Sequence, residues 1–143
     1  MSFNVLVVDD SNSMRAVIKK IINLSGFEMD QCLEASNGRE ALDLLEDSWV
    51  DVIISDINMP EMNGLQLLAV LQNDEFLRAI PVIVVSTESR DDRIAEAFRL
   101  GAGGFIKKPF LPDEIRRKLF EVIGVRDDGE YGTDEGDDDE FDF

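Results

Sequence analysis

The chain alternates short runs of apolar, largely β-branched residues with longer segments in which apolar residues recur at helical spacing. The run at 50–55 is too short for a helix, stops at Asp56 and leads into a loop that contains a proline and a glycine. This pattern is typical of a buried parallel strand that ends in a carboxylate. Similar runs predict four more strands, at about residues 3–8, 27–34, 81–85 and 104–106, of which 27–34 has the weakest pattern.

Capping residues indicate where the intervening helices begin. The Ser-Asn-Ser sequence at 11–13 precedes a helix expected at 14–24, and Asn37 with Glu40 can form a capping box for the second helix. A fifth helix is expected to start at Pro112, with a weaker cap because no Ser, Thr, Asp or Asn precedes it. The third and fourth helices are expected at 64–72 and at about 90–100.

Five strands that alternate with five amphipathic helices predict an α/β fold with an open parallel sheet. Ligands of such folds bind in the crevice beyond the carboxyl ends of the strands. The stripe of the first helix is expected to include Val17 and Leu24 beside its isoleucines. Trp49 is expected to pack in the turn before the third strand.

Composition restricts the function. The 143 residues have the length of one domain, with a net charge of −17, and residues 127–143 hold ten acids and no Lys or Arg. Residues 1–126 therefore carry 21 acids against 14 bases, a net charge of −7. A moderately acidic domain argues against a nucleic-acid surface.

The chain contains no histidine. This excludes Ser-His-Asp and Cys-His nucleophiles, histidine zinc sites and a role as the phosphohistidine member of a relay. Cys32 is the only cysteine and has no basic neighbour in sequence, so an ordinary residue of the second strand is favoured over a reactive thiol. Without a basic leader or an apolar run of eighteen residues, we expect a cytoplasmic protein that does not insert into membranes.

Polar side chains follow four of the predicted strands. Asp9 and Asp10 follow the first, Asp56 the third, Ser86 the fourth and Lys108 the fifth. Three neighbouring carboxylates would repel one another, so a cation should compensate them, and oxygen ligands suit Mg²⁺. A carboxylate can also attack a phosphoryl group, whose charge an ammonium and a hydroxyl would then stabilise.

Each of these residues has an ordinary structural interpretation as well. A pair of aspartates after a strand can simply cap the next helix, a serine there is usually a turn residue, and a single lysine is usually a solvated charge. Their joint occurrence at four strand ends favours a functional site over a purely structural domain.

The motifs resemble the receiver domain of two-component response regulators, in particular single-domain regulators of chemotaxis. The resemblance covers about residues 4–124 and rests on Asp9-Asp10, Asp56 followed by Ile57-Asn58-Met59-Pro60 and Gly64, Ile80-Pro81 before Ser86, and Lys108-Pro109-Phe110. It implies a flavodoxin-like (βα)5, doubly wound parallel sheet with strand order 2-1-3-4-5, the order already described for such regulators. It also implies a cis bond between Lys108 and Pro109.

The resemblance implies a role for each site residue. Asp56 is the expected phosphoacceptor, and Ser86 and Lys108 are expected to contact the phosphoryl oxygens. Asp10, Asp56 and the backbone carbonyl of Asn58 are the expected Mg²⁺ ligands, with Asp9 assisting, often through water. Asn58 and Glu88 are expected to flank the attacking water and to tune the lifetime of the phosphoryl group. Phe105 is expected to be the switch aromatic, with a fixed core residue as the alternative.

The implied function is a phosphorylation-activated switch that is not a turnover enzyme. It receives a phosphoryl group from a histidine kinase and binds a target protein through its helix 4, strand 5 and helix 5 face, with the flagellar motor switch as the favoured target. A phosphate sink or relay intermediate is the alternative, and a small Mg²⁺-dependent aspartyl-phosphate phosphatase is a weaker one, because such enzymes place Asp-x-Asp after the first strand. A monomer or weak dimer is expected.

The acidic segment departs from the family pattern. The receiver domain is expected at 1–126, and 127–143 lacks apolar periodicity and reads as a disordered, solvated tail. The alternative is that the tail shields the three bases at 116–118 or docks through Phe141 and Phe143.

Overall fold

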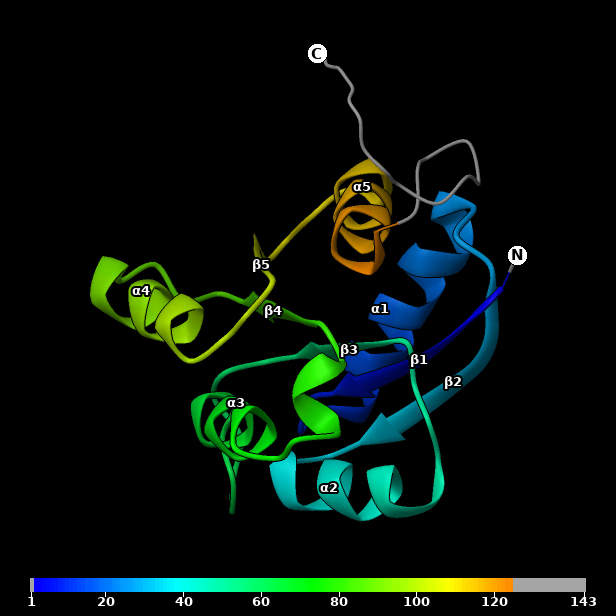
Figure 1. Cartoon of the computed structure of the whole chain (residues 1–143). Coiled ribbons are helices and arrows are strands. Elements are labelled where there is room, and N and C mark those ends of the chain that lie inside the picture. Colours follow the sequence, from blue (N-terminus) through cyan, green and yellow to red (C-terminus); the bar gives the residue numbers. More distant parts are fainter. Residues whose placement is uncertain (1, 125–143) are drawn as a thin grey trace.

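The strands form one parallel sheet in the order β2-β1-β3-β4-β5, as expected. The structure, a computed structural model, describes residues 2–124. The strands are β1 (Phe3–Val8), β2 (Met29–Ala35), β3 (Val52–Ser55), β4 (Val82–Ser86) and β5 (Gly104–Lys107). The helices are α1 (Asn12–Ser25), α2 (Gly38–Asp47), α3 (Gly64–Gln72), α4 (Asp91–Arg99) and α5 (Pro112–Ile123), and a 3₁₀ turn, η1, covers Leu77–Ala79 (Figure 1).

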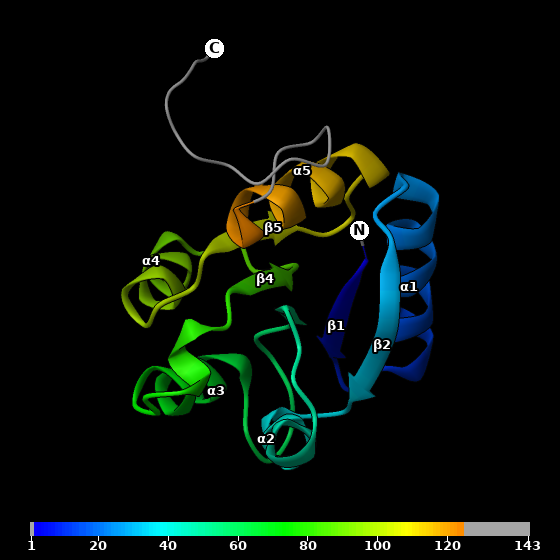
Figure 2. The same ribbon diagram turned by 45° about the vertical axis from the view of Figure 1, so that its right-hand side comes forward.

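The direction of winding reverses between β1 and β3. The chain first moves outward from β1 to β2 and then returns to form β3 on the other side of β1. Helices α1 and α5 cover one face of the sheet and lie side by side, whereas α2, α3 and α4 cover the other (Figures 1 and 2). The connections after β1 and β3 therefore diverge, which leaves a crevice at the carboxyl edge of the sheet.

Two apolar cores fill the two faces. Because side chains alternate along a strand, Val5 and Val7 of β1 enter one core while Leu6 and Val8 enter the other, and all four are fully buried. The α1–α5 core consists of Phe3, Val5, Val7, Ile18, Ile22, Phe27, Val52, Ile54, Ile83, Val85, Ile106, Phe110, Ile115 and Leu119. The α2–α4 core consists of Leu6, Val8, Ala35, Ala41, Leu45, Val50, Ile53, Ile57, Leu67, Leu68, Leu71, Ile80, Val82, Val84 and Ala97.

The helix caps follow the sequence with one difference. Ser11 Oγ accepts a hydrogen bond from Met14 N at 3.1 Å, and Asn37 Oδ1 accepts one from Glu40 N at 2.9 Å. The Glu40 carboxylate, however, accepts from Ser36 N at 2.8 Å, one residue earlier than a capping box requires. The expected weak cap of α5 is confirmed, since Leu111 contributes no side-chain acceptor.

Three packing expectations are wrong. Val17 and Leu24 are 46% and 68% exposed, because the buried stripe of α1 runs through residues 15, 18, 22 and 25 and both side chains project away from it. Trp49 is 56% exposed. It precedes β3 at the amino edge of the sheet, the edge opposite to the one on which Asp56 follows that strand.

The expected boundary at 126 and the expected tail at 127–143 lie outside the described residues and stay predictions. Within residues 2–124, none of the helices has the length and apolar character that crossing a bilayer requires.

Candidate functional site

Backbone hydrogen bonds extend the sheet beyond its strand ends and fix the residues that follow. Asp9 N donates to the carbonyl of the last residue of β2 at 3.0 Å, and Asp56 N donates to that of β1 at 3.0 Å. Lys108 N donates to the carbonyl of Ser86, the last residue of β4, at 2.9 Å. The rigid sheet therefore positions these side chains, as a preorganised site requires.

The three expected carboxylates meet at this edge. Asp9, Asp10 and Asp56 each offer an oxygen atom, and these oxygens all lie within 4.8 Å of one another. Asp9 is buried, Asp56 is partly buried and Asp10 is exposed. The solvent exposure of the three carboxylates thus increases from Asp9 through Asp56 to Asp10.

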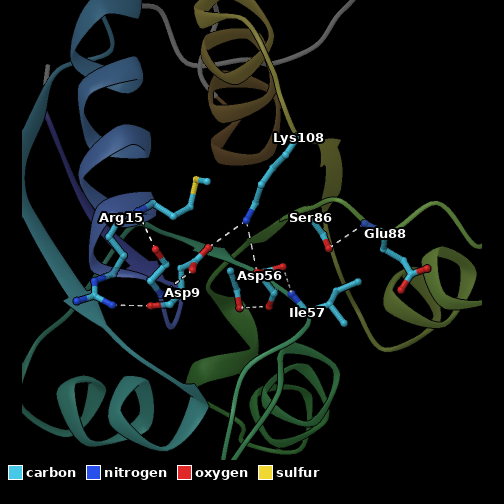
Figure 3. A network of polar contacts seen from close by, with 10 residues as sticks. Asp9, Arg15, Asp56, Ile57, Ser86, Glu88 and Lys108 are labelled. Atoms are coloured by element: carbon cyan, nitrogen blue, oxygen red, sulfur yellow. Dashed lines mark hydrogen bonds and ion pairs between the residues drawn. The ribbon is translucent and has the colours of Figure 1, made fainter.

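Lys108 reaches between two of these carboxylates (Figure 3). Its Nζ atom lies 3.1 Å from Asp9 Oδ2 and 3.4 Å from Asp56 Oδ2. All three side chains are at most 14% exposed, so solvent screens their charges little. The ammonium offsets the repulsion between the two carboxylates that the sequence predicted.

The other oxygen of each of these carboxylates accepts a backbone donor. Ser11 N donates to Asp9 Oδ1 at 2.9 Å, and Ile57 N donates to Asp56 Oδ1 at 2.7 Å. Both carboxylates are therefore held in one orientation, with one oxygen on the backbone and the other on Lys108.

Arg15 of α1 holds the backbone of Asp9 in place, a role that was not predicted from the sequence. This buried side chain donates from Nη1 to the Asp9 carbonyl at 2.5 Å (Figure 3). It also donates from Nε to Glu34 Oε1 at 2.9 Å and from Nη2 to Asn12 Oδ1. A signal was present, because Arg15 falls on the same helical stripe as Ile18. A charged residue on an apolar stripe needs buried partners.

Ser86 is fully buried at the end of β4. Its Oγ accepts a hydrogen bond from Glu88 N at 3.1 Å (Figure 3). A hydroxyl carries its own donor as well as acceptor lone pairs, so Ser86 keeps a hydrogen that it can donate. Residue 86 also pairs in register with Lys107 of β5, which ties the strands on this side of the site together.

The loop after β3 is folded tightly against Asp56. Gly64 N donates to Ile57 O at 2.8 Å, and a Cβ atom on Gly64 would collide with the Asp56 carbonyl oxygen. Only glycine permits this approach. Glu61, at φ 66°, takes the left-handed conformation inside the same loop.

The remaining expected residues lie around this centre. Asn58 is exposed and Glu88 is partly buried, and both face Arg93 of α4. Phe105 is partly buried against the α2–α4 core, and the Lys108-Pro109 bond is cis, as the sequence predicted. Their assigned roles stay predictions.

Cys32 is separate from the site. It lies on β2, and burial raises the pKa of its thiol above the ordinary value of 9.0, although Lys19 acts in the opposite direction. A thiol that is protonated at neutral pH is a poor nucleophile, which agrees with the structural interpretation.

The donor set suits a hard divalent cation. Three carboxylates with clustered oxygens are oxygen ligands of the type that Mg²⁺ prefers, and the exposed Asp10 leaves room for the waters that Mg²⁺ usually keeps. Asp9 is less available than Asp10, because its side chain is buried and pairs with Lys108.

Comparison with known proteins agrees with this geometry. The chain belongs to the response regulator receiver domain family, which matches residues 5–120. It is 40% identical over 123 residues to chemotaxis protein CheY1 of Helicobacter pylori, covering 85% of this chain and 98% of that protein. It is 41% identical over 121 residues to the CheY homolog of Campylobacter jejuni, covering 84% and 92%.

Solved structures confirm the flavodoxin-like fold. The chemotaxis response regulator CheY4 of Vibrio cholerae superposes with a TM-score of 0.74 at 33% identity, covering 85% of this chain and 99% of that one. The receiver domain of a sensor histidine kinase from Pseudomonas aeruginosa, solved with magnesium in its active site cleft, superposes with a TM-score of 0.76 at 22% identity, covering 87% and 100%. The latter supports the fold alone.

Family membership therefore makes the chain a phosphorylation-regulated response regulator of the CheY-like type. Such domains act as signalling switches and not as classical enzymes. Membership in the family implies a histidine kinase as phosphodonor, a downstream target and Mg²⁺ in the acidic pocket formed by the three aspartates.

Proposed function

We propose that Asp56 accepts a phosphoryl group from the phosphohistidine of a kinase and that the chain then signals by protein contact in chemotaxis. The observation that carries the proposal is the grouping of three carboxylates around Lys108, with Asp56 at a strand end and partly open to solvent. The CheY relatives support the chemotactic setting.

The transfer needs a nucleophile and compensating charge. An Asp56 carboxylate oxygen would attack phosphorus while the bond from phosphorus to the histidine nitrogen breaks and the imidazole leaves. The Lys108 ammonium, already paired with Asp56, would then neutralise charge on the phosphoryl oxygens. The Ser86 hydroxyl, whose hydrogen is available, would donate to one of them.

Asp10, Asp56 and the Asn58 carbonyl would hold Mg²⁺, with Asp9 assisting through water. When bound, the ion offsets negative charge on the transferring phosphoryl group. Asp9 also keeps Lys108 beside Asp56, because its carboxylate pairs with the same ammonium.

An apolar groove supports docking of the phosphodonor protein. The groove has a volume of about 290 Å³ and is lined by Met14, Val17, Ile21, Thr87, Lys108, Pro109 and Phe110. It gives a reason for the exposed Val17, and it shares Lys108 with the site. We infer that the kinase or its phosphotransfer domain contacts this groove, because the groove is apolar and shares Lys108 with the site.

The output face would be α4, β5 and α5, with Phe105 as the moving element. Ser86 lies on β4 next to β5, so its movement toward a phosphoryl group would change the space beside Phe105. Phe98 of α4, 48% exposed, offers apolar surface on this face for a target, with the flagellar motor switch as the favoured one.

The test is labelling by a small phosphodonor such as acetyl phosphate, with and without Mg²⁺. The wild type should take up one hydroxylamine-labile phosphoryl group only with the ion, and Asp56→Asn should take up none. Asp51→Asn is the matched control, because Asp51 lies at the amino edge of the sheet and binds Asn4 N. Undiminished labelling of Asp56→Asn would refute the proposal, and rapid turnover of many phosphoesters would favour the phosphatase.

A further inference from the structure

One arginine of α4 connects both residues that flank the phosphoacceptor. Arg93 Nη2 donates to Asn58 Oδ1 at 3.4 Å, and Arg93 Nε lies 3.8 Å from Glu88 Oε1. Asn58 belongs to the loop after β3 and Glu88 to the loop after β4. A single guanidinium therefore joins three segments around the mouth of the site.

One donor of this guanidinium lacks a hydrogen-bond partner in the described part of the chain. The Glu88 side chain is 12% exposed and that of Arg93 is 30% exposed. Arg90 N fixes Glu88 Oε2 at 3.0 Å, but Arg93 Nε is buried and has no hydrogen-bond partner within residues 2–124. Buried donors are normally satisfied, so a small approach of Glu88 Oε1 would complete a charge-assisted bond.

The other arginines of this helix region behave differently. Arg90 pairs with Asp92, where both side chains are more than 60% exposed. Arg99 pairs with Glu96 one turn along the surface. Such exposed pairs contribute little. Arg93, in contrast, turns from α4 toward the site.

We propose that Arg93 is a positioning residue that lengthens the lifetime of the phosphoryl group by holding Asn58 and Glu88 across the approach of water. The inference rests on the proposed function of Asp56. Asn58 follows Asp56 by two residues and Glu88 follows Ser86 by two, so both lie beside the expected phosphoryl position.

Repulsion between the phosphoryl group and the Glu88 carboxylate explains why Glu88 needs a cationic partner. A phosphoryl group carries about two negative charges at neutral pH, and its arrival repels the Glu88 carboxylate. Arg93 offsets this repulsion and keeps Glu88 in place. Without Arg93, Glu88 moves away and water reaches phosphorus, forming a new oxygen–phosphorus bond while the bond to Asp56 breaks, which restores the carboxylate and releases inorganic phosphate.

The test compares decay of the phosphoryl group after removal of acetyl phosphate in the presence of Mg²⁺. Arg93→Ala should lose the label about two to ten times faster than the wild type, the lower part of the range expected for coupled side chains. Arg93→Lys, which keeps the charge, should restore part of the lifetime. Arg99→Ala is the matched control and should decay like the wild type, because its exposed side chain pairs with Glu96 on the same helix.

A double-variant background separates positioning from a general structural effect. In Asn58→Ala/Glu88→Ala, adding Arg93→Ala should leave the decay rate unchanged, because the two side chains that it holds are gone. Unchanged decay in Arg93→Ala, or the same acceleration in both backgrounds, overturns the inference while leaving phosphorylation of Asp56 intact. If the wild type takes up no label, the proposed function fails and this inference fails with it.

Discussion

At the scale of single residues, the charge balance of the site depends on Lys108, whose ammonium pairs with both Asp9 and Asp56. Its ammonium lies within 3.4 Å of oxygens from both Asp9 and Asp56, and the three side chains are largely buried. Removing one partner from such a group leaves uncompensated charge, which costs more than the group contributes when intact.

We therefore expect Lys108→Ala to lower the free energy of unfolding by about 1–3 kcal/mol without Mg²⁺. Urea unfolding measures the change. Lys107→Ala, at an exposed neighbouring position, should change it by less than about 0.5 kcal/mol. The double variant Lys108→Ala/Asp9→Ala should recover part of the stability, since one of the two carboxylates that lose their cation is gone. Equal losses in the single and double variants would contradict the shared-charge account.

Asp9 and Asp10 should differ in their effect on Mg²⁺. Asp10 is exposed and available, whereas Asp9 is buried and paired with Lys108. Asp10→Asn should therefore weaken Mg²⁺ binding more than Asp9→Asn does. Calorimetric titration is the suitable measurement, because Trp49 lies before β3 at the amino edge and is poorly placed to report by fluorescence. Equal weakening of Mg²⁺ binding in both variants would contradict the prediction that Asp10 contributes more than Asp9.

The sequence predicted the centre of the site better than its supports. Asp9, Asp56 and Lys108 follow strands, and parallel strands bring their carboxyl ends together whatever the details of packing. Arg15 and Arg93 lie on helices, where most arginines are solvated. The apolar stripe of α1 offered a signal for Arg15, but only the folded structure shows that Arg93 turns inward.

At the scale of elements, Glu34 connects β2 to α1. Arg15 Nε and Lys19 Nζ lie 2.9 Å and 3.1 Å from its carboxylate oxygens. The hydrogen bond from Arg15, followed by that from Lys19, lowers the pKa of the Glu34 carboxyl below its ordinary value of 4.5. The ionised form is thus favoured in the folded protein.

A lowered pKa gives a stability contribution that is present above the unfolded pKa and lost as the pH falls through the folded one. We expect Glu34→Gln to be less stable than the wild type by about 0.5–1 kcal/mol at neutral pH, since the pair is partly exposed. Urea unfolding at a series of pH values measures the difference, which should disappear at a pH below the folded-state pKa of the Glu34 carboxyl. Glu46→Gln, at an exposed position on α2, is the control. A difference that persists in acid would show that the ion pair is not its cause.

The elements themselves were predictable because periodicity and caps agree. The α3 bounds, Gly64–Gln72, are those expected, and the β1 bounds are too. The wrong burial predictions arise where the apolar pattern does not determine which way a side chain points. Val17 is apolar yet lines a surface groove, and Trp49 follows the end of a helix and is more than half exposed. The η1 turn after α3 lacks apolar periodicity, so no local signal marks it.

At the scale of the whole molecule, the acidic segment at 127–143 is expected to be a solvated tail, and its proposed effect is a weak association with the output face. Two of the three bases at 116–118 already have partners: Arg116 donates to Ser25 O at 2.8 Å and lies over the Phe120 ring, and Lys118 pairs with Glu121 at 2.8 Å. Any association of the acidic segment with this surface should therefore be weak and sensitive to salt.

Deleting residues 127–143 should leave phosphorylation of Asp56 nearly unchanged and strengthen target binding modestly at low salt. Exposed ion pairs contribute only about 0 to 1 kcal/mol each, and salt screens them. The target is identified by pull-down with and without a phosphoryl mimic, and its affinity is then titrated at several salt concentrations. Loss of binding at every salt concentration would instead favour docking through Phe141 and Phe143.

The central claim is that the phosphoryl group is carried by Asp56, and chemical mapping tests it most directly. Borohydride reduces an acyl phosphate, so the labelled residue is converted to homoserine and can be located by peptide mass spectrometry. After phosphorylation with Mg²⁺, the account predicts homoserine at position 56 alone. Homoserine at position 9 or 10, or label that survives hydroxylamine on a serine or threonine, would contradict it.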